Sequence, residues 1–212
     1  MKLIKKDVNE PLVFNKWQKE GGWDASDPNI NPKAFKLKQE IKELLLKEQG
    51  FLCCYCEERI TEDNKSSHIE HLRPKGMGEY ARLKSSYSNL LCSCNSGSSC
   101  GETKKNSTIT ITPLKPNCED YFTYSYNGEM EGINQDATET ISILNLNSER
   151  LKIARYGVIL QFLHMDELTS MTSLSEYDNW VHIFLEKDDK GHFITFWSMV
   201  KWLADDNRCY FE

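Results

Sequence analysis

The sequence lacks any apolar run that approaches the roughly 18 residues needed to cross a bilayer. Its first residues, Met-Lys-Leu-Ile-Lys-Lys-Asp, also lack the long apolar core of a secretory signal peptide. Its 212 residues contain no internal repeat and no low-complexity segment, so we expect one or two globular domains. These absences predict a cytoplasmic protein without a membrane partner.

An excess of positive charge is also missing, because 26 Lys and Arg residues stand against 32 Asp and Glu residues. A protein that coats nucleic acid with its whole surface is therefore not expected. The charge is uneven along the chain: residues 65–105 hold seven basic and three acidic residues, whereas residues 175–212 hold four basic and eight acidic residues. Contacts with nucleic acid are therefore expected within residues 65–105.

Cysteine is abundant and clustered. Six of the eight cysteines fall between Cys53 and Cys100, and the other two, Cys118 and Cys209, are isolated. In a cytoplasmic chain, such clustering favours metal binding over disulfide formation. The competing interpretation is a set of buried thiols that pack as small apolar groups.

Cys53 and Cys56 have the spacing of a zinc knuckle, in which a tight turn brings two thiolates to one tetrahedral ion at about 2.3 Å. A second pair would have to come from Cys92, Cys94 and Cys100. The spacing alone leaves the choice among these three open.

The adjacent residues Glu70 and His71 are candidates for catalysis. On a regular strand they would point to opposite faces, so they can share one reaction centre only near a strand end or a bulge. Pro74 provides such an end three residues later. Without further context, the pair would be a surface pair or a histidine with ordinary hydrogen bonds.

The order of these motifs resembles that of the zinc-ribbon HNH endonucleases, whose ββα-metal core is stabilised by zinc on four cysteines. The resemblance rests on Cys-x-x-Cys, Glu-His-x-x-Pro, Asn89-Leu90-Leu91 and the later cysteines with Lys104. In that family the third cysteine follows the asparagine by five residues, and a lysine stands four residues after the last cysteine. The resemblance therefore implies a structural Zn²⁺ bound by Cys53, Cys56, Cys94 and Cys100, and it leaves Cys54 and Cys92 as packing residues.

The resemblance also implies roles for individual residues. His71 would be the general base that activates water, Glu70 would bind a catalytic Mg²⁺ or Mn²⁺, and Asn89 would orient the His71 ring. A neutral imidazole with a pKa near 6.5 and a divalent ion suit phosphodiester hydrolysis. The expected nucleic-acid contacts are Arg73, Lys75, Lys104 and Lys105.

One position departs from the family pattern. The residue after the last cysteine, normally His or Asn, is Gly101, which has no side chain to offer a metal. The second protein ligand could then be Glu102, Asn95, Asn106 or His68, or water and substrate could replace it.

Residues 35–165 resemble one branch in particular, the HNH nuclease subunit of Septu-type and retron-associated antiphage systems. The resemblance implies a DNA endonuclease that acts as the effector of a defence system in a hetero-oligomer with an ATPase subunit. A retron reverse transcriptase with its RNA–DNA hybrid is a further partner. The alternatives are a nuclease that cuts RNA or tRNA, and a zinc-stabilised module with a degenerate HNH site that binds nucleic acid or a partner.

We therefore expect an α+β protein in which a small ββα-metal core with a four-cysteine zinc site is embedded in a mostly helical chain. Residues 1–50 would form an arm and a helix, 51–112 the nuclease core, and 113–212 a hairpin and a helical region that packs on the core or binds a partner. The arm up to residue 30 is expected to be irregular. The helix after it should begin at Asn31-Pro32 and end at Gly50. Strands are expected at 109–111, 121–126 and 129–133, and helices at 136–144, 148–165, 176–186 and 193–204.

Overall fold

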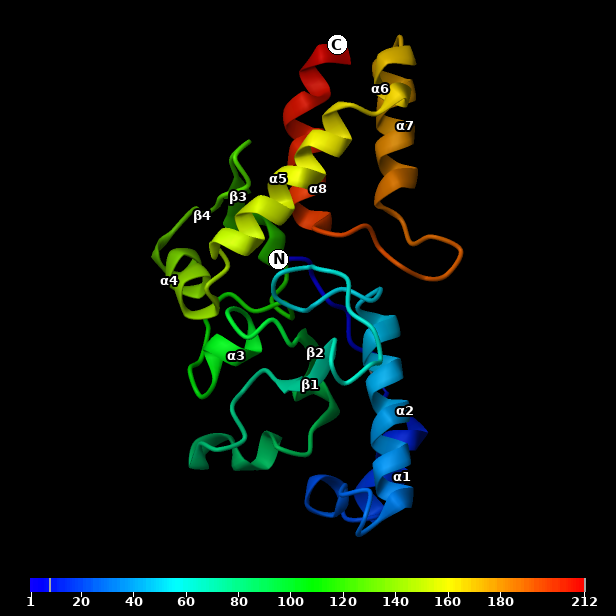
Figure 1. Cartoon of the computed structure of the whole chain (residues 1–212), viewed down its shortest axis with the longest axis vertical. Helices are drawn as coiled ribbons and strands as arrows, with labels where there is room; N and C mark the ends of the chain where they lie inside the picture. The colour runs from blue at the N-terminus through cyan, green and yellow to red at the C-terminus, as the bar shows by residue number, and fades with distance from the viewer. Residues whose placement is uncertain (8, 212) are drawn as a thin grey trace.

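The computed structural model describes residues 1–7 and 9–211. Figure 1 shows an elongated molecule, with the N-terminal helices and one small sheet at one end and the C-terminal helices at the other. The α+β, mostly helical architecture is as predicted. Its helices and strands are α1 (Leu12–Lys19), α2 (Pro32–Glu48), β1 (Ser67–His71), β2 (Leu90–Cys94), α3 (Gly101–Lys104), β3 (Phe122–Tyr124), β4 (Met130–Gly132), α4 (Gln135–Leu144), α5 (Glu149–Leu163), α6 (Asp166–Ser170), α7 (Leu174–Leu185) and α8 (Trp197–Asn207).

Helix α2 forms where the sequence predicts it. The Asn31 side chain accepts a hydrogen bond of 3.0 Å from the backbone N–H of Ala34, and proline occupies the first helical position. The helix ends before Gly50, whose φ of 58° lies in the left-handed region, and a Cβ there would collide with the ring of Phe193. Helix α2 packs against β2 and leads directly into the first cysteine pair.

Two antiparallel pairs of strands make up the sheets of the described chain. Strand β1 pairs with β2, so that Glu70 lies opposite Leu91 and His71 opposite Leu90. Strands β3 and β4 pair around the predicted turn, in which Gly128 has a φ of 83°. The prediction of a strand at 109–111 is wrong. This segment is coil and bend, and its two isoleucines are buried in the core.

The N-terminal arm is more ordered than its sequence suggests. Helix α1 forms within the segment that was expected to be irregular, because Phe14 and Trp17 are both fully buried. The Trp17 indole donates a 2.8 Å hydrogen bond to Ser26 Oγ and meets Trp23 edge-on, with ring centroids 5.0 Å apart. This packing holds the arm against the body of the protein and fixes the position of Trp23.

The C-terminal helices are attached to the first cysteine pair through Glu57. This buried carboxylate accepts hydrogen bonds from the backbone N–H and the hydroxyl of Ser198 at the start of α8, at 2.7 and 2.5 Å. The first turn of α8 is thereby anchored to the residue that follows Cys56. Among the described residues, no helix combines the length and the hydropathy that a membrane span requires.

Candidate active site

Four thiols lie together in the core. The sulfur atoms of Cys53, Cys56, Cys94 and Cys100 are all within 4.8 Å of one another, and all four residues are buried. Two sulfurs bound at about 2.3 Å to one tetrahedral ion would be about 3.8 Å apart. The Sγ atoms of Cys56 and Cys94 are 3.8 Å apart. The donor set and its geometry therefore fit a closed, four-thiolate Zn²⁺ site.

The other thiols of the cluster favour the thiolate form of Cys53, whereas burial and the neighbouring sulfurs raise the pKa of Cys56 and Cys100. Burial alone would raise the pKa of Cys53, but hydrogen bonds from the neighbouring thiols lower it well below its ordinary value. The backbone N–H of Cys94 also donates to Cys53 Sγ, at 3.3 Å. Phe51 and Glu57, on either side of the pair, adopt φ values of 60° and 64°, which bend the chain tightly around the two sulfurs.

The other buried cysteines described here lie outside the cluster. The Cys92 thiol donates to the carbonyl of Lys42 on α2, at 3.7 Å, and burial raises its pKa to about 12. Burial likewise raises the pKa of Cys54 well above its usual range. Cys118 donates to the carbonyl of Met1, at 3.3 Å. These thiols are packed, protonated groups.

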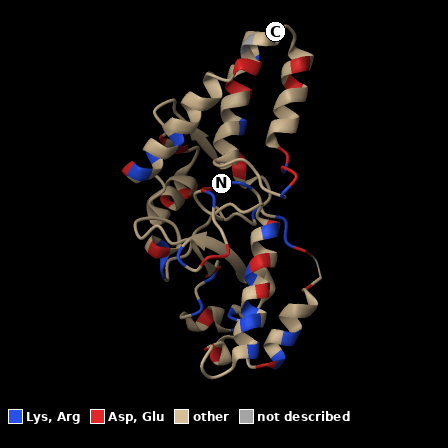
Figure 2. Ribbon diagram, turned by 45° about the vertical axis from the view of Figure 1, so that its right-hand side comes forward, with Lys and Arg blue, Asp and Glu red and all other residues tan. Residues whose placement is uncertain are grey.

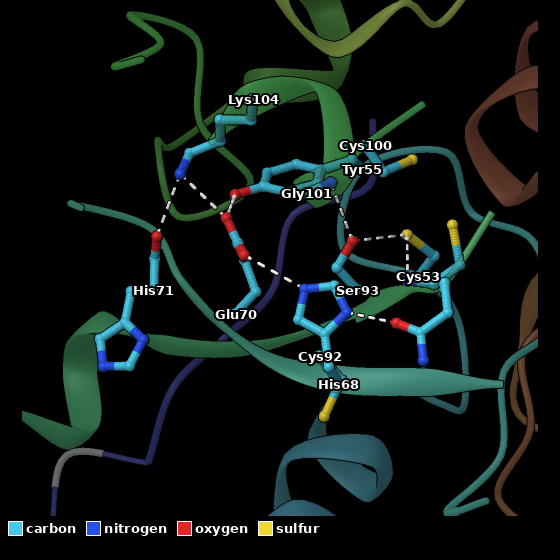
Figure 3. A network of polar contacts seen from close by, with 12 residues as sticks. Cys53, Tyr55, His68, Glu70, His71, Cys92, Ser93, Cys100, Gly101 and Lys104 are labelled. Atoms are coloured by element: carbon cyan, nitrogen blue, oxygen red, sulfur yellow. Dashed lines mark hydrogen bonds and ion pairs between the residues drawn. The ribbon is translucent and has the colours of Figure 1, made fainter. Parts of the chain in front are cut away.

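The two oxygens of the Glu70 carboxylate have different partners. Oε1 accepts a 2.9 Å hydrogen bond from Lys104 Nζ and a 3.0 Å hydrogen bond from the Tyr55 hydroxyl. Oε2 lies 3.4 Å from His68 Nε2 (Figure 3). Burial would raise the pKa of Glu70, but His68 and Lys104 hold it below its ordinary value. Glu70 is therefore a fixed, ionised carboxylate with one oxygen oriented by protein donors.

Lys104 has a different position from the one expected for a phosphate contact. Its side chain is 1% exposed, and its ammonium also donates to the carbonyl of His71, at 3.1 Å. It is the internal cation that balances Glu70, and it cannot reach a nucleic acid from this position. The adjacent Lys105 is exposed.

Because only one of these neighbouring lysines is buried, the same substitution should have a large effect on stability at Lys104 and a small one at Lys105. Lys104→Met should lower the free energy of unfolding by about 3–5 kcal/mol, because it leaves the buried Glu70 carboxylate without its cation. Lys105→Met should change stability by less than about 0.5 kcal/mol. Urea denaturation without added divalent cation measures both. Equal stability of the two variants would contradict the internal role of Lys104.

His71 occupies the last position of β1, and its ring lies apart from the Glu70 carboxylate (Figure 3). Its Nε2 is 3.1 Å from the carbonyl of Lys84, an acceptor that requires the ring proton to be on Nε2. Nδ1 is then the nitrogen with the free lone pair. The indole of Trp23 covers the ring, with centroids 4.8 Å apart, and burial lowers the pKa of His71 to about 4. The imidazole is therefore neutral near pH 7.

Asn89 does not contact the His71 ring as expected. Its Oδ1 accepts from the backbone N–H of Arg73 at 2.7 Å, and its Nδ2 donates to the carbonyls of Arg73 and Leu83 at 3.0 and 3.1 Å. These bonds clamp the two ends of the loop between the strands. Asn89 holds the carbonyl of Leu83, and the carbonyl of the following residue, Lys84, accepts from the His71 ring. Asn89 therefore positions the ring indirectly, through the backbone of the loop.

Four residues were candidates for the metal ligand that Gly101 cannot provide. His68 contacts Glu70, since the two residues are two positions apart on β1 and share a face. Asn95 contacts His68 rather than Glu70. Glu102 and Asn106 are exposed. The spacing of two residues between His68 and Glu70 could have indicated from the sequence that the two side chains lie on the same face of a strand.

Two basic side chains lie over Trp23, the residue that covers His71. The ammonium groups of Lys38 and Lys75 lie 4.6 and 5.5 Å from the centroid of Trp23. Lys75 and Lys105 are exposed, and Arg73 is half-buried. In Figure 2, basic residues are frequent at the end of the molecule that contains α1 and α2. Lys75 and Lys105 are therefore open to solvent, whereas Lys104 is not.

No protein-family model matches the chain. The chain is similar to a curated protein of Vibrio cholerae serotype O1 biovar El Tor named "Retron Vc95 putative HNH endonuclease". The two are 26% identical over 174 residues, a match that covers 76% of this chain and 84% of the relative. This similarity confirms the resemblance to HNH endonucleases related to retrons.

Proposed function

From the similarity to a retron HNH endonuclease, we propose that the chain is a metal-dependent endonuclease that hydrolyses phosphodiester bonds of DNA. The observation that carries the proposal is the arrangement on β1. Glu70 has one oxygen held by Lys104 and the other oxygen directed to His68. His71 follows on the same strand as a neutral imidazole with Nδ1 as its basic nitrogen.

We assign residues 51–112 to the nuclease core, a ββα-metal fold in which β1, β2 and α3 hold the site. Structural Zn²⁺ would be bound by the four clustered thiolates, which come from the first knuckle, the end of β2 and the start of α3. Such a closed site leaves no position open for substrate, so its role is to fold the core. The division of the chain into 1–50, 51–112 and 113–212 remains part of this proposal.

For catalysis, His71 Nδ1 is the group that would accept the proton of the attacking water. The carbonyl of Lys84 fixes the ring, and Asn89 fixes the loop that carries this carbonyl. Glu70 would bind Mg²⁺ or Mn²⁺, which as a Lewis acid stabilises the negative charge that develops on the phosphate and on the leaving oxygen. Arg73, Lys75 and Lys105 would contact the phosphate backbone.

We further propose a biological system and partner subunits for this nuclease. The relative's name places that protein in a retron. By the resemblance described above, this chain would act in antiphage defence, in a hetero-oligomer with an ATPase subunit of a Septu-type or retron system and, in a retron, with the reverse transcriptase and its RNA–DNA hybrid. Seven buried, unpaired thiols suit the reducing cytoplasm.

The direct test is a cleavage assay. The zinc-loaded protein, alone and with the proposed ATPase subunit, is incubated with supercoiled plasmid DNA and millimolar Mg²⁺ or Mn²⁺. We expect nicked or linear DNA, and no product when the divalent ion is omitted. Single-stranded RNA and tRNA serve as parallel substrates. If the RNA or tRNA is degraded while the DNA stays intact, the protein is an RNA nuclease.

A second candidate function is favoured by Gly101, which removes a ligand that the family normally supplies. In that case the chain would be a zinc-stabilised module that binds nucleic acid or a partner without cutting it. DNA binding without cleavage, under all the conditions above, is the result that would support this alternative.

A further inference from the structure

The orientation of the Glu70 carboxylate leaves one oxygen for a ligand outside the protein. Lys104 and Tyr55 both donate to Oε1 and fix the plane of the group. Oε2 points toward His68 Nε2, 3.4 Å away (Figure 3). The Glu70 side chain is 11% exposed and that of His68 is 32% exposed, so neither side chain is fully enclosed by the protein.

A chain of hydrogen bonds determines which nitrogen of His68 carries the proton. Asn95 Nδ2 donates to the carbonyl of Asn64 at 2.6 Å, which turns Asn95 Oδ1 toward the imidazole. Oδ1 accepts from His68 Nδ1 at 2.5 Å, so the proton is on Nδ1. In the neutral ring, Nε2 then directs its lone pair at an anionic oxygen. This contact repels unless a cation or a second proton lies between the two atoms.

Gly101 lies at the same gap. A Cβ at this position would be 2.9 Å from His68 Nε2 and 3.0 Å from Glu70 Oε2. The side chain that the HNH pattern normally has after the last cysteine would therefore enter the space between these two atoms. The absence of a side chain at Gly101 allows the His68 ring to occupy that space.

We propose that His68 replaces the missing third ligand of the HNH pattern, so that His68 Nε2 and Glu70 Oε2 together bind the divalent cation. This inference rests on the proposed function and names the second protein ligand of its metal site. The arrangement has the form common to metal-binding histidines, because the other ring nitrogen donates to an amide oxygen that fixes the ring. Two ligand atoms at about 2.1 Å from one octahedral ion are about 3.0 Å apart, close to the observed 3.4 Å.

An imidazole ligand also affects the choice of ion. Mg²⁺ prefers oxygen ligands, whereas first-row transition ions accept imidazole nitrogen. The site is therefore expected to bind Mn²⁺ more tightly than Mg²⁺. Replacing His68 should reduce this preference, because the ligands that remain are oxygens.

The test measures binding of Mn²⁺ itself, from the electron paramagnetic resonance signal of the free ion during titration of the zinc-loaded protein. We expect His68→Ala to weaken Mn²⁺ binding by about tenfold or more. The matched control is His182→Ala. His182 also lies next to a glutamate, with its Nε2 3.2 Å from Glu186 Oε1, but both side chains are exposed at the C-terminal end of α7. This control should leave Mn²⁺ affinity unchanged. Zinc content and the thermal transition verify the fold of each variant.

A double variant tests the exchange of ligands directly. Gly101 has no left-handed φ, so its backbone conformation allows a side chain, and once the His68 ring is removed the nearest contact of a Cβ is Glu70 Oε2, at 3.0 Å. In His68→Ala with Gly101→Asn, the amide returns to the usual third position, and we expect part of the lost Mn²⁺ affinity to return.

Two results would overturn the inference and would be distinguishable. If Mn²⁺ binding and cleavage depend on Glu70 but are unaffected by His68→Ala, His68 is only a charged partner of Glu70 and the proposed function stands. If the wild-type protein neither binds Mn²⁺ nor cuts nucleic acid, the metal site and the proposed function fail together.

Discussion

Replacing Cys94 by serine is expected to abolish cooperative folding of the core. Structural zinc on thiolates contributes an apparent 10–16 kcal/mol, roughly, in small zinc-binding peptides. This is as large as the total stability of a typical domain, about 5–15 kcal/mol. Cys94 belongs to β2, which forms the sheet with β1, and its sulfur lies 3.8 Å from that of Cys56. We therefore expect no cooperative thermal transition in the variant and less than one zinc ion per chain by elemental analysis.

Cys92→Ala is the matched control for this experiment. Cys92 lies two residues earlier on the same strand and is equally buried, but its thiol contacts the carbonyl of Lys42. Its replacement should cost about 1 kcal/mol, the typical effect of a single substitution, and should leave one zinc ion bound. Equal zinc contents in the Cys94 and Cys92 variants would show that the cluster is a set of packed thiols.

Replacing His71 by glutamine is expected to lower the cleavage rate by about 10²- to 10⁴-fold, the usual contribution of a general base. Glutamine can still donate to the carbonyl of Lys84, which His71 Nε2 reaches at 3.1 Å, and it fills much of the space beneath Trp23. It has no nitrogen that can accept a proton from water. The variant should therefore retain its fold, its zinc and its affinity for DNA. Single-turnover cleavage and DNA binding on the same preparation separate these effects.

The control for His71 is His164→Ala, because His164 is exposed at the end of α5. Its replacement should leave cleavage unchanged. If the His71→Gln variant cleaves DNA at the same rate as the wild-type protein, His71 is not the general base. His68, beside Glu70, would then be the histidine to test.

The sequence predicted the residues of the cysteine cluster only with the help of the family spacing. Cys-x-x-Cys could be interpreted directly as a zinc knuckle, but Cys92, Cys94 and Cys100 were equivalent candidates for the second pair. The choice depends on the pairing of β2 with β1 and on the turn at Cys100, whose φ is 62°. Both result from tertiary packing, which the spacing of cysteines does not encode.

The prediction that Lys104 contacts nucleic acid is wrong, because the sequence shows the charge of a residue but not whether its side chain is buried. A signal was present, however. Positions 101 and 104 are three residues apart and face the same side of a helical turn. Since Gly101 faces Glu70, Lys104 does so as well, and its ammonium balances the carboxylate. The sequence could have indicated this pair once α3 was recognised as one turn of helix.

Helix α1 lies in the arm that the sequence predicts to be irregular, because proline and glycine flank it and usually interrupt regular structure. Pro11 and Gly21 in fact mark its two ends: Pro11 is the N-cap, and Gly21 follows the C-cap. The eight-residue helix between them is too short to be stable by itself, and buried aromatic rings hold it in place. The position of Trp23 over His71 depends on the same packing and could not be inferred from the order of residues.

The crowding around Gly101 has an evolutionary consequence. Because a Cβ there would lie 2.9 Å from His68 Nε2 and 3.0 Å from Glu70 Oε2, a side chain at position 101 requires the imidazole at position 68 or the carboxylate at position 70 to shift. We therefore expect positions 68 and 101 to vary as a pair among related chains. A homologue with asparagine or histidine at the position equivalent to Gly101 should have a residue other than histidine at the position equivalent to His68.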